Sequence, residues 1–584
     1  MRGHLSACRA YKRRLPDSPA SRLTVREMMQ ANPQPTTELR DEAAAAALLI
    51  GGCSLNLWQP REMKHFIRLV SPNGSNYVPP SRNTIINTWL PVIYSRIQQE
   101  VLDEVINASD CLNIIFDASD DTGNLRQLNI SVATPDKPAV FWRMIDTGSI
   151  RHTARETANF VKEAIADLVA GPSGPEWGRI NAFVSDTCNP AVAACRVLIQ
   201  DPGLQHTFAV YCDSHGLQLL VKDLFDRNAS IKEMLAPFIS TATFFRTSTL
   251  QLARLQVKQR ELYGRTYAIR AGSFTRWGSH FKTLTSFARS KAALQGYAAE
   301  MMAMMSSGET QGPEASSIQP HADRLLGHRF WEDLIALTDL LGPIDEAIRM
   351  SEADRSDVSK VVKRWTAIHA NWQTIQPRHA MNLPWPQIYA AYDQRMRRQC
   401  TGINWLAYAL DPALFQLSDT VYNGAIATIK ELARQERLGQ QMIAEFIEFR
   451  GQMSRYSTEA PEWRNQLPPR LFWISYRARG GRKLPLLACR LFGCIANAVP
   501  SERSFSSMNF LKSRLSNRLT SNNLDMWLAI YINSRVLERV REPGDNGGDD
   551  GDNSDDEEDE ELVEQLILTG ARADELFDDW ASDG

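Results

Sequence analysis

The sequence predicts an α/β fold combined with an all-α region: a mixed β-sheet with helices on its faces, joined to a large helical domain. Two observations predict this class. Between residues 111 and 225, short apolar runs rich in β-branched residues alternate with helical patterns in the order β-β-β-α-β-α-β-α. From about residue 226 to 480, the strand signal nearly disappears, and long helical patterns separated by Pro or Gly follow one another.

The composition is that of an ordinary globular protein and excludes several other classes. The 584 residues are 43% apolar and 23% charged, enough for roughly three or four domains, which excludes a mini-protein, a collagen-like chain and a wholly disordered chain. No run approaches the roughly 18 apolar residues of a membrane span, so no membrane partner is expected. The first residues lack the apolar core of a signal peptide, and nine scattered cysteines do not make a disulfide scaffold. An intracellular location is therefore expected.

The charge is divided between a basic body and an acidic C-terminal segment. Residues 542–584 hold 18 acidic residues and one Arg, whereas the rest of the chain carries 64 Lys and Arg against 50 Asp and Glu, a net charge of +14. A basic body favours nucleic acid as partner because phosphate binding releases counterions; the alternative is ordinary surface charge. The acidic segment cannot pack a core, which predicts a disordered tail.

The N-terminal part predicts an arm followed by helices. Residues 1–45, rich in Pro, Ser, Arg and Ala, predict a disordered basic arm, whose Lys12–Arg14 cluster suits either a nuclear localisation signal or a solvated surface. Residues 46–110 predict a helical region. Within it, residues 81–107 place apolar side chains at helical spacing, and Ser81 is the expected N-cap of one long amphipathic helix.

Residues 111–225 predict the sheet and its first helices. Three strands joined by short turns, at 112–117, 126–135 and 139–148, predict an antiparallel meander. The elements expected next are a helix, a strand, a helix, a strand and a helix, at 151–169, 180–186, 189–200, 208–213 and 215–225. Because a strand–helix–strand connection produces a parallel pair, this order predicts a mixed sheet.

The remaining globular part is expected to be helical throughout. Residues 226–480 predict an all-α domain in which 306–320, rich in Gly, Pro and Ser, is interpreted as a linker. Residues 481–541 predict two or three further helices. Their apolar stripe is either local core or a protein–protein surface, and it consists of Leu524, Trp527, Leu528, Ile530, Tyr531 and Val536.

Two aspartates follow apolar strand signals and are candidates for metal chemistry. Asp117 comes after LNIIF, and Asp186 comes after INAFVS. Loops at the carboxyl ends of strands commonly build the sites of α/β sheets. Two carboxylates that meet there repel each other unless a cation lies between them, and oxygen ligands select Mg²⁺ or Mn²⁺. The alternative is that both residues form turns or cap helices, and Asp120 and Asp121 compete with Asp117 for the role.

Other chemistry-bearing residues are ambiguous by themselves. Cys212 and His215 form one C-x-x-H pair without a second pair nearby, so no structural zinc is expected and a packing role is the alternative. Trp277 beside Arg276 suits stacking on an unpaired base, although most tryptophans are core residues. Glu502 precedes a helical pattern, where an acidic residue is also favoured by the helix dipole.

In their order along the chain, these segments resemble the hAT superfamily of DNA transposases and their domesticated relatives. The resemblance covers about residues 70 to 540. Its C-terminal block is the most specific part, and the individual aspartate motifs are weak alone. The segments that carry it are YVPPSRNTI, FDASDD followed by RQLNISV, FVSDTCNP, YCDSHGLQLLVKDL, FTRWGSH and VPSERSFSSMNFLKSRLSNRLTSNNLDMWLAIYIN.

The resemblance implies an RNase H-like core interrupted by the helical region, with a D-D-E site of Asp117, Asp186 and Glu502 that binds two Mg²⁺ or Mn²⁺ ions. It implies DNA nicking, hairpin formation and strand transfer in the nucleus, with no small-molecule substrate. Trp277 with Arg276 would then stack on an extruded base, and Cys212 and His215, also assigned to DNA binding, would lie near the active site. It also implies a dimer or higher oligomer, with contacts from Phe505, Leu511, Leu524, Trp527, Leu528, Ile530 and Tyr531.

The chain departs from the family pattern at two places. Ser119 stands where many members have Trp, which leaves the choice of Asp117 over Asp120 open. Within the first 110 residues, Cys8 and Cys53 with two histidines cannot supply the ligands of a BED-type zinc finger. The alternative function is therefore a catalytically silent, transposase-derived protein that binds DNA and dimerises.

Overall fold

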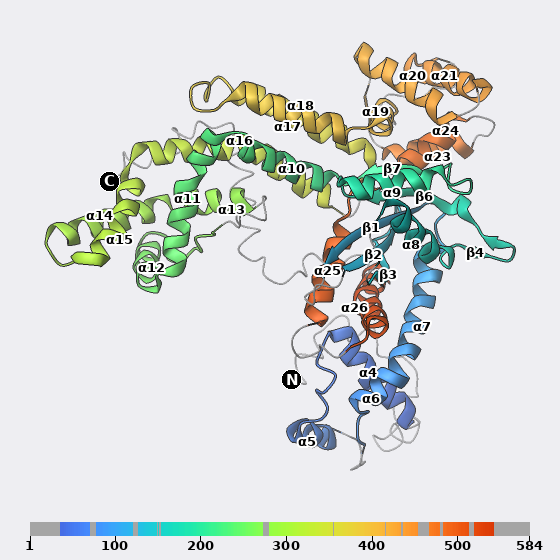
Figure 1. Ribbon diagram of the computed structural model, residues 1–584, viewed down its shortest axis with the longest axis horizontal. Coiled ribbons are helices and arrows are strands. Elements are labelled where there is room, and N and C mark those ends of the chain that lie inside the picture. The colour runs from blue at the N-terminus through green and yellow to red at the C-terminus, as the bar shows by residue number, and fades with distance from the viewer. Residues whose placement is uncertain are drawn as a thin grey trace, which may run out of the picture. The chain divides into compact units, whose positions relative to one another are not determined.

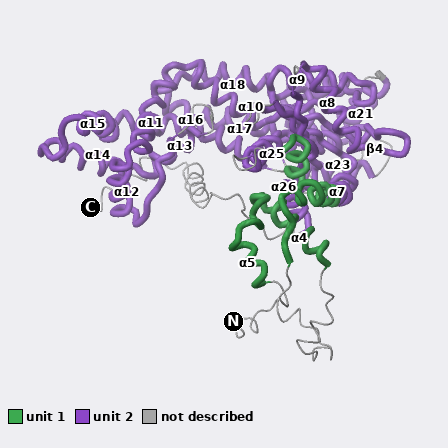
Figure 2. Tube along the Cα trace, turned by 60° about the horizontal axis from the view of Figure 1, so that its bottom comes forward, with its two compact units in different colours: residues 1–97, 514–531 green, residues 98–513, 532–584 purple. Residues whose placement is uncertain are grey.

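The structure is a computed structural model of the chain (Figure 1). The residues it describes are 36–70, 77–120, 126–148, 150, 153–271, 279–353, 356–414, 416–433, 436–453, 467–478, 483–512 and 519–541. The predicted basic arm up to residue 35, the Arg276–Trp277 pair and the acidic tail lie outside these residues. Figure 2 colours two compact units, one made of residues 1–97 with 514–531, the other of 98–513 with 532–584.

The larger unit contains the predicted mixed sheet, whose strand order is β3-β2-β1-β6-β7. β1 pairs antiparallel with β2, and β2 with β3; β1–β6 and β6–β7 are parallel. The α/β character expected for this segment is therefore confirmed. The strands are β1 (Leu112–Asp120), β2 (Arg126–Ala133), β3 (Val140–Asp146), β6 (Ile180–Ser185) and β7 (Phe208–Tyr211).

Helices follow the strands in the predicted order. They are α8 (Ala154–Ala166), α9 (Asn189–Gln200) and α10 (Asp213–Asp226). A capping box starts α8, because Thr153 Oγ1 accepts from the N–H of Glu156 while the Glu156 carboxylate accepts from the N–H of Thr153. The Gly-Pro-rich stretch after α8 forms the short hairpin of β4 (Ala170–Gly171) and β5 (Gly174–Pro175).

The all-α region expected after the sheet is also present. Its helices are α11 (Ala229–Thr247), α12 (Thr249–Tyr263), α13 (Ser279–Arg289), α14 (Lys291–Ser306), α15 (Gly312–Leu326), α16 (His328–Glu352), α17 (Val358–Ile375), α18 (Trp385–Gln399), α19 (Gly402–Ala409), α20 (Asp419–Ala433), α21 (Glu436–Arg450) and α23 (Pro469–Ala478). A helix with the length and apolarity that a membrane crossing demands is not found in the described part of the chain.

The linker predicted at 306–320 is wrong, since α15 occupies most of it. Three side chains spaced by four and three residues, Ile318, Ala322 and Leu325, are completely buried. Pro313 stands in the first turn, where a missing N–H costs no helical hydrogen bond. The small and polar residues between these apolar positions concealed a helix that packs through one narrow stripe.

The smaller unit contains α4 (Thr37–Gly51), α5 (Arg61–Val70), α6 (Arg82–Thr84) and a π-helical segment, Ile85–Trp89, that leads into α7 (Leu90–Val101). The predicted N-cap is confirmed, because Ser81 Oγ accepts from the N–H of Thr84 at 3.2 Å. The expected disordered range 1–45 extends too far. α4 begins at Thr37, and Ala45, Leu48 and Leu49 are buried, because a run of alanines and leucines has high helix propensity.

The C-terminal helices are α24 (Leu484–Leu491), α25 (Val499–Leu511) and α26 (Ser521–Arg541). The apolar stripe on these helices was expected to be either local core or a protein–protein surface, and its burial fits the local core better. Six of the seven residues named for dimerisation are buried within the single chain: Phe505, Leu511, Leu524, Trp527, Leu528 and Ile530. Trp527 Nε1 also donates to the Leu49 carbonyl at 2.9 Å, so its polar atom is used internally.

Two histidines of the helical region are held neutral by burial. His280 of α13 is 1% exposed and meets the ring of Phe225 edge-on, at 5.1 Å between centroids. Burial lowers its pKa to about 4. His321 of α15 stacks on Phe244 at 4.3 Å, and burial, followed by the charge of Arg324, lowers its pKa to about 4.

The helical region is therefore expected to lose stability as the pH falls from about 6.5 to 4. Unfolded histidine takes up a proton near pH 6.5, whereas folded His280 and His321 remain neutral until about pH 4, so acid favours the unfolded state. For His280 the loss reaches at most about 3 kcal/mol. Thermal unfolding across this pH range should give a flatter profile for a His280→Gln/His321→Gln variant. Equally steep profiles would contradict this assignment.

Candidate active site

The register of the sheet brings Asp117 and Asp186 to neighbouring positions at β1 and β6, which are parallel. Ile115 of β1 pairs with Val184 of β6, and each aspartate lies two residues further along the chain, Asp117 within β1 and Asp186 directly after β6. One sequence expectation is corrected: β1 continues to Asp120, so Asp117 lies within the strand rather than after its end. Asp186 does follow β6 directly, and its Oδ1 accepts from the N–H of Cys188 at 3.2 Å.

Glu502 reaches the same place from the C-terminal part of the chain. It is an exposed residue in the first turn of α25, the helix that packs across β1, β2 and β3. The connection is a buried amide: Asn129 lies directly opposite Asp117 in the antiparallel β1–β2 pair, and its Nδ2 donates to the carbonyl of Ser501 at 3.2 Å. The residue that follows Ser501 is therefore held beside Asp117.

The pKa of Asp117 is affected by both of the other acids. Its pKa is raised to about 7, first because the carboxyl is buried and then because Asp186 and Glu502 repel its charge. The N–H of Ala118, which donates to Asp117 Oδ1 at 2.8 Å, works in the opposite direction. Three acids separated by up to several hundred residues in the sequence thus act on one another in the folded chain.

The donor set suits a hard divalent cation, although the side chains are not gathered around one point. Among the described residues, no three His, Cys, Asp or Glu side chains lie close enough together to hold a metal ion. Carboxylate oxygens are nevertheless the ligands that Mg²⁺ and Mn²⁺ prefer. Two buried oxygens next to them, Asn129 Oδ1 and Ser501 Oγ, have no hydrogen-bond partner. A cation among the carboxylates would relieve the repulsion that raises the pKa of Asp117.

A fourth acid, Glu352 at the end of α16, lies beside Glu502. Asn497 Nδ2 donates to the carbonyls of Ser351 and Ala353, at 3.0 and 3.1 Å, and so binds the end of α16 to the segment that leads into α25. The pKa of Glu352 is raised by burial and then by the charge of Glu502. The helical region therefore adds a carboxylate to the surroundings of the site.

Within the C-x-x-H pair, Cys212 takes a structural position inside the fold. Cys212 is 2% exposed, its N–H donates to the Ser185 carbonyl at 2.8 Å, and its Sγ accepts from the N–H of Ala498 at 3.2 Å. The Cys212 sulfur is therefore used inside the fold and does not form a surface for DNA, while its contacts with Ser185 and Ala498 agree with the expected position near the candidate acids. His215 is half-buried in the first turn of α10.

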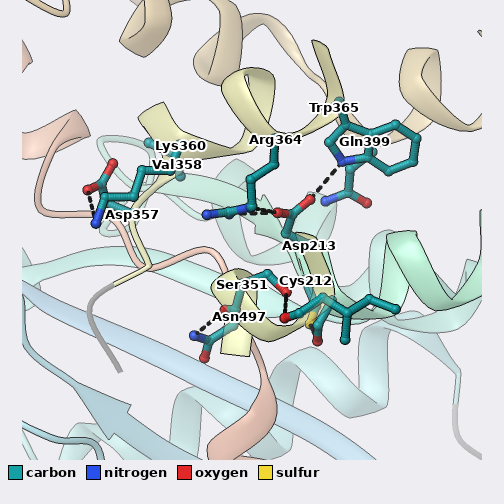
Figure 3. Close-up of polar contacts among 12 residues, drawn as sticks. Cys212, Asp213, Ser351, Asp357, Val358, Lys360, Arg364, Trp365, Gln399 and Asn497 are labelled. Carbon is teal, nitrogen blue, oxygen red and sulfur yellow. Dashed lines mark hydrogen bonds and ion pairs between the residues drawn. The ribbon is translucent and has the colours of Figure 1, made fainter. Parts of the chain in front are cut away.

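Between these two residues, Asp213 forms a buried ion pair with the helical region (Figure 3). Its carboxylate accepts from Arg364 Nε at 2.7 Å and from Trp365 Nε1 at 2.8 Å, and Arg364 Nη2 lies 2.6 Å from the same oxygen that Nε contacts. Asp213 is fully buried and Arg364 is 4% exposed. The Asp213 N–H donates to the Ala496 carbonyl at 2.8 Å, which connects the pair to the segment before α25.

The comparisons with known proteins add no family. No protein-family model matches the chain, and no curated protein matches it. The chemistry of this site is therefore inferred from its residues and their geometry.

Sequence reasoning found the three acids but missed the residues that bring them together. Asn129 carried a detectable signal, because it is a polar residue inside an otherwise apolar strand pattern. Asp213 stands within the C-x-x-H motif, yet nothing in the sequence pointed to Arg364 as its partner. Glu352 and Asn497 gave no signal, since isolated acids and amides on helices are usually solvated.

Proposed function

We propose that this chain is a hAT-like DNA transposase: an RNase H-like core whose D-D-E site, Asp117, Asp186 and Glu502, nicks DNA, forms hairpins and transfers strands with Mg²⁺ or Mn²⁺. The observation that carries the proposal is that Asp186 and Glu502, from distant positions in the chain, lie close enough to Asp117 to repel its charge. The sheet order β3-β2-β1-β6-β7, antiparallel on one side of β1 and parallel on the other, supports the RNase H-like assignment.

The residues of the chain have separable roles in this chemistry. Asp117, Asp186 and Glu502 would hold the ions. When bound, a pair of divalent ions supplies an activated water or hydroxyl and stabilises the leaving oxygen of a phosphodiester. Trp277 would stack on the base extruded for hairpin formation, with Arg276 at the adjacent phosphate. This motif directly precedes α13, which packs against the same helix, α16, that ends at Glu352.

The proposal includes a dimer or higher oligomer, DNA as partner and a nuclear location. Because the apolar residues of α25 and α26 named for dimer contacts are mostly buried within the chain, an interface between copies would use other surfaces. The second candidate is a catalytically silent DNA-binding and dimerisation protein. The observation that favours it is that the described side chains do not gather into a group that can hold a metal ion.

Nicking of supercoiled plasmid in Mg²⁺ or Mn²⁺ tests the proposal. The wild-type chain is expected to nick, and Glu502→Gln and Asp186→Asn are each expected to lower the rate about 10³-fold or more, equivalent to about 4 kcal/mol of transition-state stabilisation. Glu38→Gln, an exposed position in the first turn of α4, is the matched control. Absence of nicking in the wild type, or equal rates in all variants, would favour the silent protein.

A further inference from the structure

A cluster of arginines surrounds one tyrosine between α12 and α13. The guanidinium carbon of Arg289 lies 3.8 Å from the centroid of the Tyr267 ring, and that of Arg265 lies 4.9 Å from it. Arg265 Nε also donates to Tyr267 Oη at 3.0 Å. We name Arg265, Tyr267 and Arg289 the Tyr267 cluster.

The backbone beneath the cluster is held in place from inside the fold. The completely buried Gln259 donates through Nε2 to the Tyr267 carbonyl at 2.9 Å and accepts through Oε1 from the Tyr267 N–H at 3.1 Å. Further along, the Arg270 N–H donates to Ser286 Oγ at 3.2 Å. The backbone of the extended segment is therefore fastened to α12 and α13, and the Tyr267 ring, on which Arg265 and Arg289 lie, is held in place.

The segment that carries the cluster is rich in Lys and Arg, although Lys258 at its start is paired with Glu261 and Glu300. Residues 258–291 contain eight Lys and Arg and one acidic residue, Glu261. The pKa of Tyr267 is lowered, first by its hydrogen bond with Arg265 and then by the neighbouring Arg289, against the effect of burial. Arg265 is exposed, while Arg270 and Arg289 are half-buried. Cations that stack on an aromatic face remain able to donate hydrogen bonds at the edge of the guanidinium group.

We propose that the Tyr267 cluster binds the phosphate backbone of a DNA strand. Guanidinium groups bind phosphate oxygens in a bidentate manner, and prior ordering by the tyrosine reduces the entropy lost on binding. This inference rests on the proposed function only in naming DNA as the polyanion, and it does not require that the protein cuts DNA.

Binding in the absence of metal tests the cluster independently of cutting. The full-length chain carrying Glu502→Gln is titrated, in EDTA, into a fluorescent 30-nucleotide DNA strand and into a hairpin, from 50 to 300 mM salt. Arg265→Gln/Arg289→Gln is expected to weaken binding about tenfold, and to reduce the slope of log affinity against log salt by about 1.5 to 2. Arg329→Gln/Arg349→Gln on α16 is the matched double control and should leave that slope unchanged.

Tyrosine variants separate an ordered cluster from simple positive charge. Tyr267→Phe keeps the ring and should bind like the parent, whereas Tyr267→Leu should lose several-fold in affinity at an unchanged melting temperature.

An unchanged salt slope in the arginine double variant would overturn the inference. So would displacement of the DNA by polyglutamate, which carries no phosphate, as readily as by unlabelled DNA. If nicking fails but the slope changes as expected, the cluster is supported and the transposase proposal falls. If the wild type nicks but the slope is unchanged, the transposase proposal is supported and the cluster falls.

Discussion

Replacing Asp117 by asparagine is expected to make the metal-free protein more stable while removing its response to Mn²⁺. The carboxyl is buried and repelled by Asp186 and Glu502, which raises its pKa to about 7, so a neutral amide removes an unfavourable charge. In the wild type, Mn²⁺ at about 100 times its Kd should stabilise the fold by about 2.7 kcal/mol. Thermal unfolding with and without Mn²⁺ measures both effects, and plasmid nicking should stop.

Asp120→Asn is the matched control for this prediction. It lies on the same strand, β1, and was the alternative that the sequence left open. If Mn²⁺ still raises the melting temperature of Asp117→Asn but not that of Asp120→Asn, then Asp120 rather than Asp117 is the metal ligand. A wild-type chain whose melting temperature does not respond to Mn²⁺ or Mg²⁺ would contradict the metal site altogether.

Replacing Arg364 by methionine is expected to destabilise the larger unit by about 3–5 kcal/mol, because a buried carboxylate is left without its cation. Burial already raises the pKa of Asp213, although Arg364 and Trp365 act against it. Removing the cation therefore leaves a charge that water cannot reach. Denaturant unfolding followed by tryptophan fluorescence measures the loss.

Two variants give this prediction its controls. Adding Asp213→Asn to Arg364→Met should restore most of the stability, since the asparagine is neutral and its oxygen can still accept from Trp365 Nε1. Arg349→Met removes a guanidinium from an exposed pair with Glu346 on α16 and should cost less than about 1 kcal/mol. If Arg364→Met costs no more than Arg349→Met, the ion pair is not a major contributor to stability.

The local elements of this fold could be predicted because their signals lie within a few residues of one another. The alternation in RQLNISVA and the apolar run before Asp186 identify strands β2 and β6 directly. The predictions were wrong where the local composition is typical of a loop but the segment packs as a helix. Gly, Pro and Ser concealed α15, and a basic, Pro-containing N-terminus obscured the start of α4.

The candidate site was predictable only in part. Asp117, Asp186 and Glu502 stand in recognisable motifs, but the register that aligns Ile115 with Val184 decides that the two aspartates are neighbours. The buried amide of Asn129 decides that α25 begins beside them. Likewise, the stripe of α26 could be core or interface until the structure showed Trp527 buried.

By itself, the sequence determined the order of strands and helices, the division of charge and the identity of the candidate acids, since each is a property of neighbouring residues. Only the tertiary structure decided that Asp213 meets Arg364, that Cys212 is internal and that Glu352 stands beside Glu502. Such contacts join segments more than a hundred residues apart, and their energy depends on burial and geometry that exist only once the whole unit has packed.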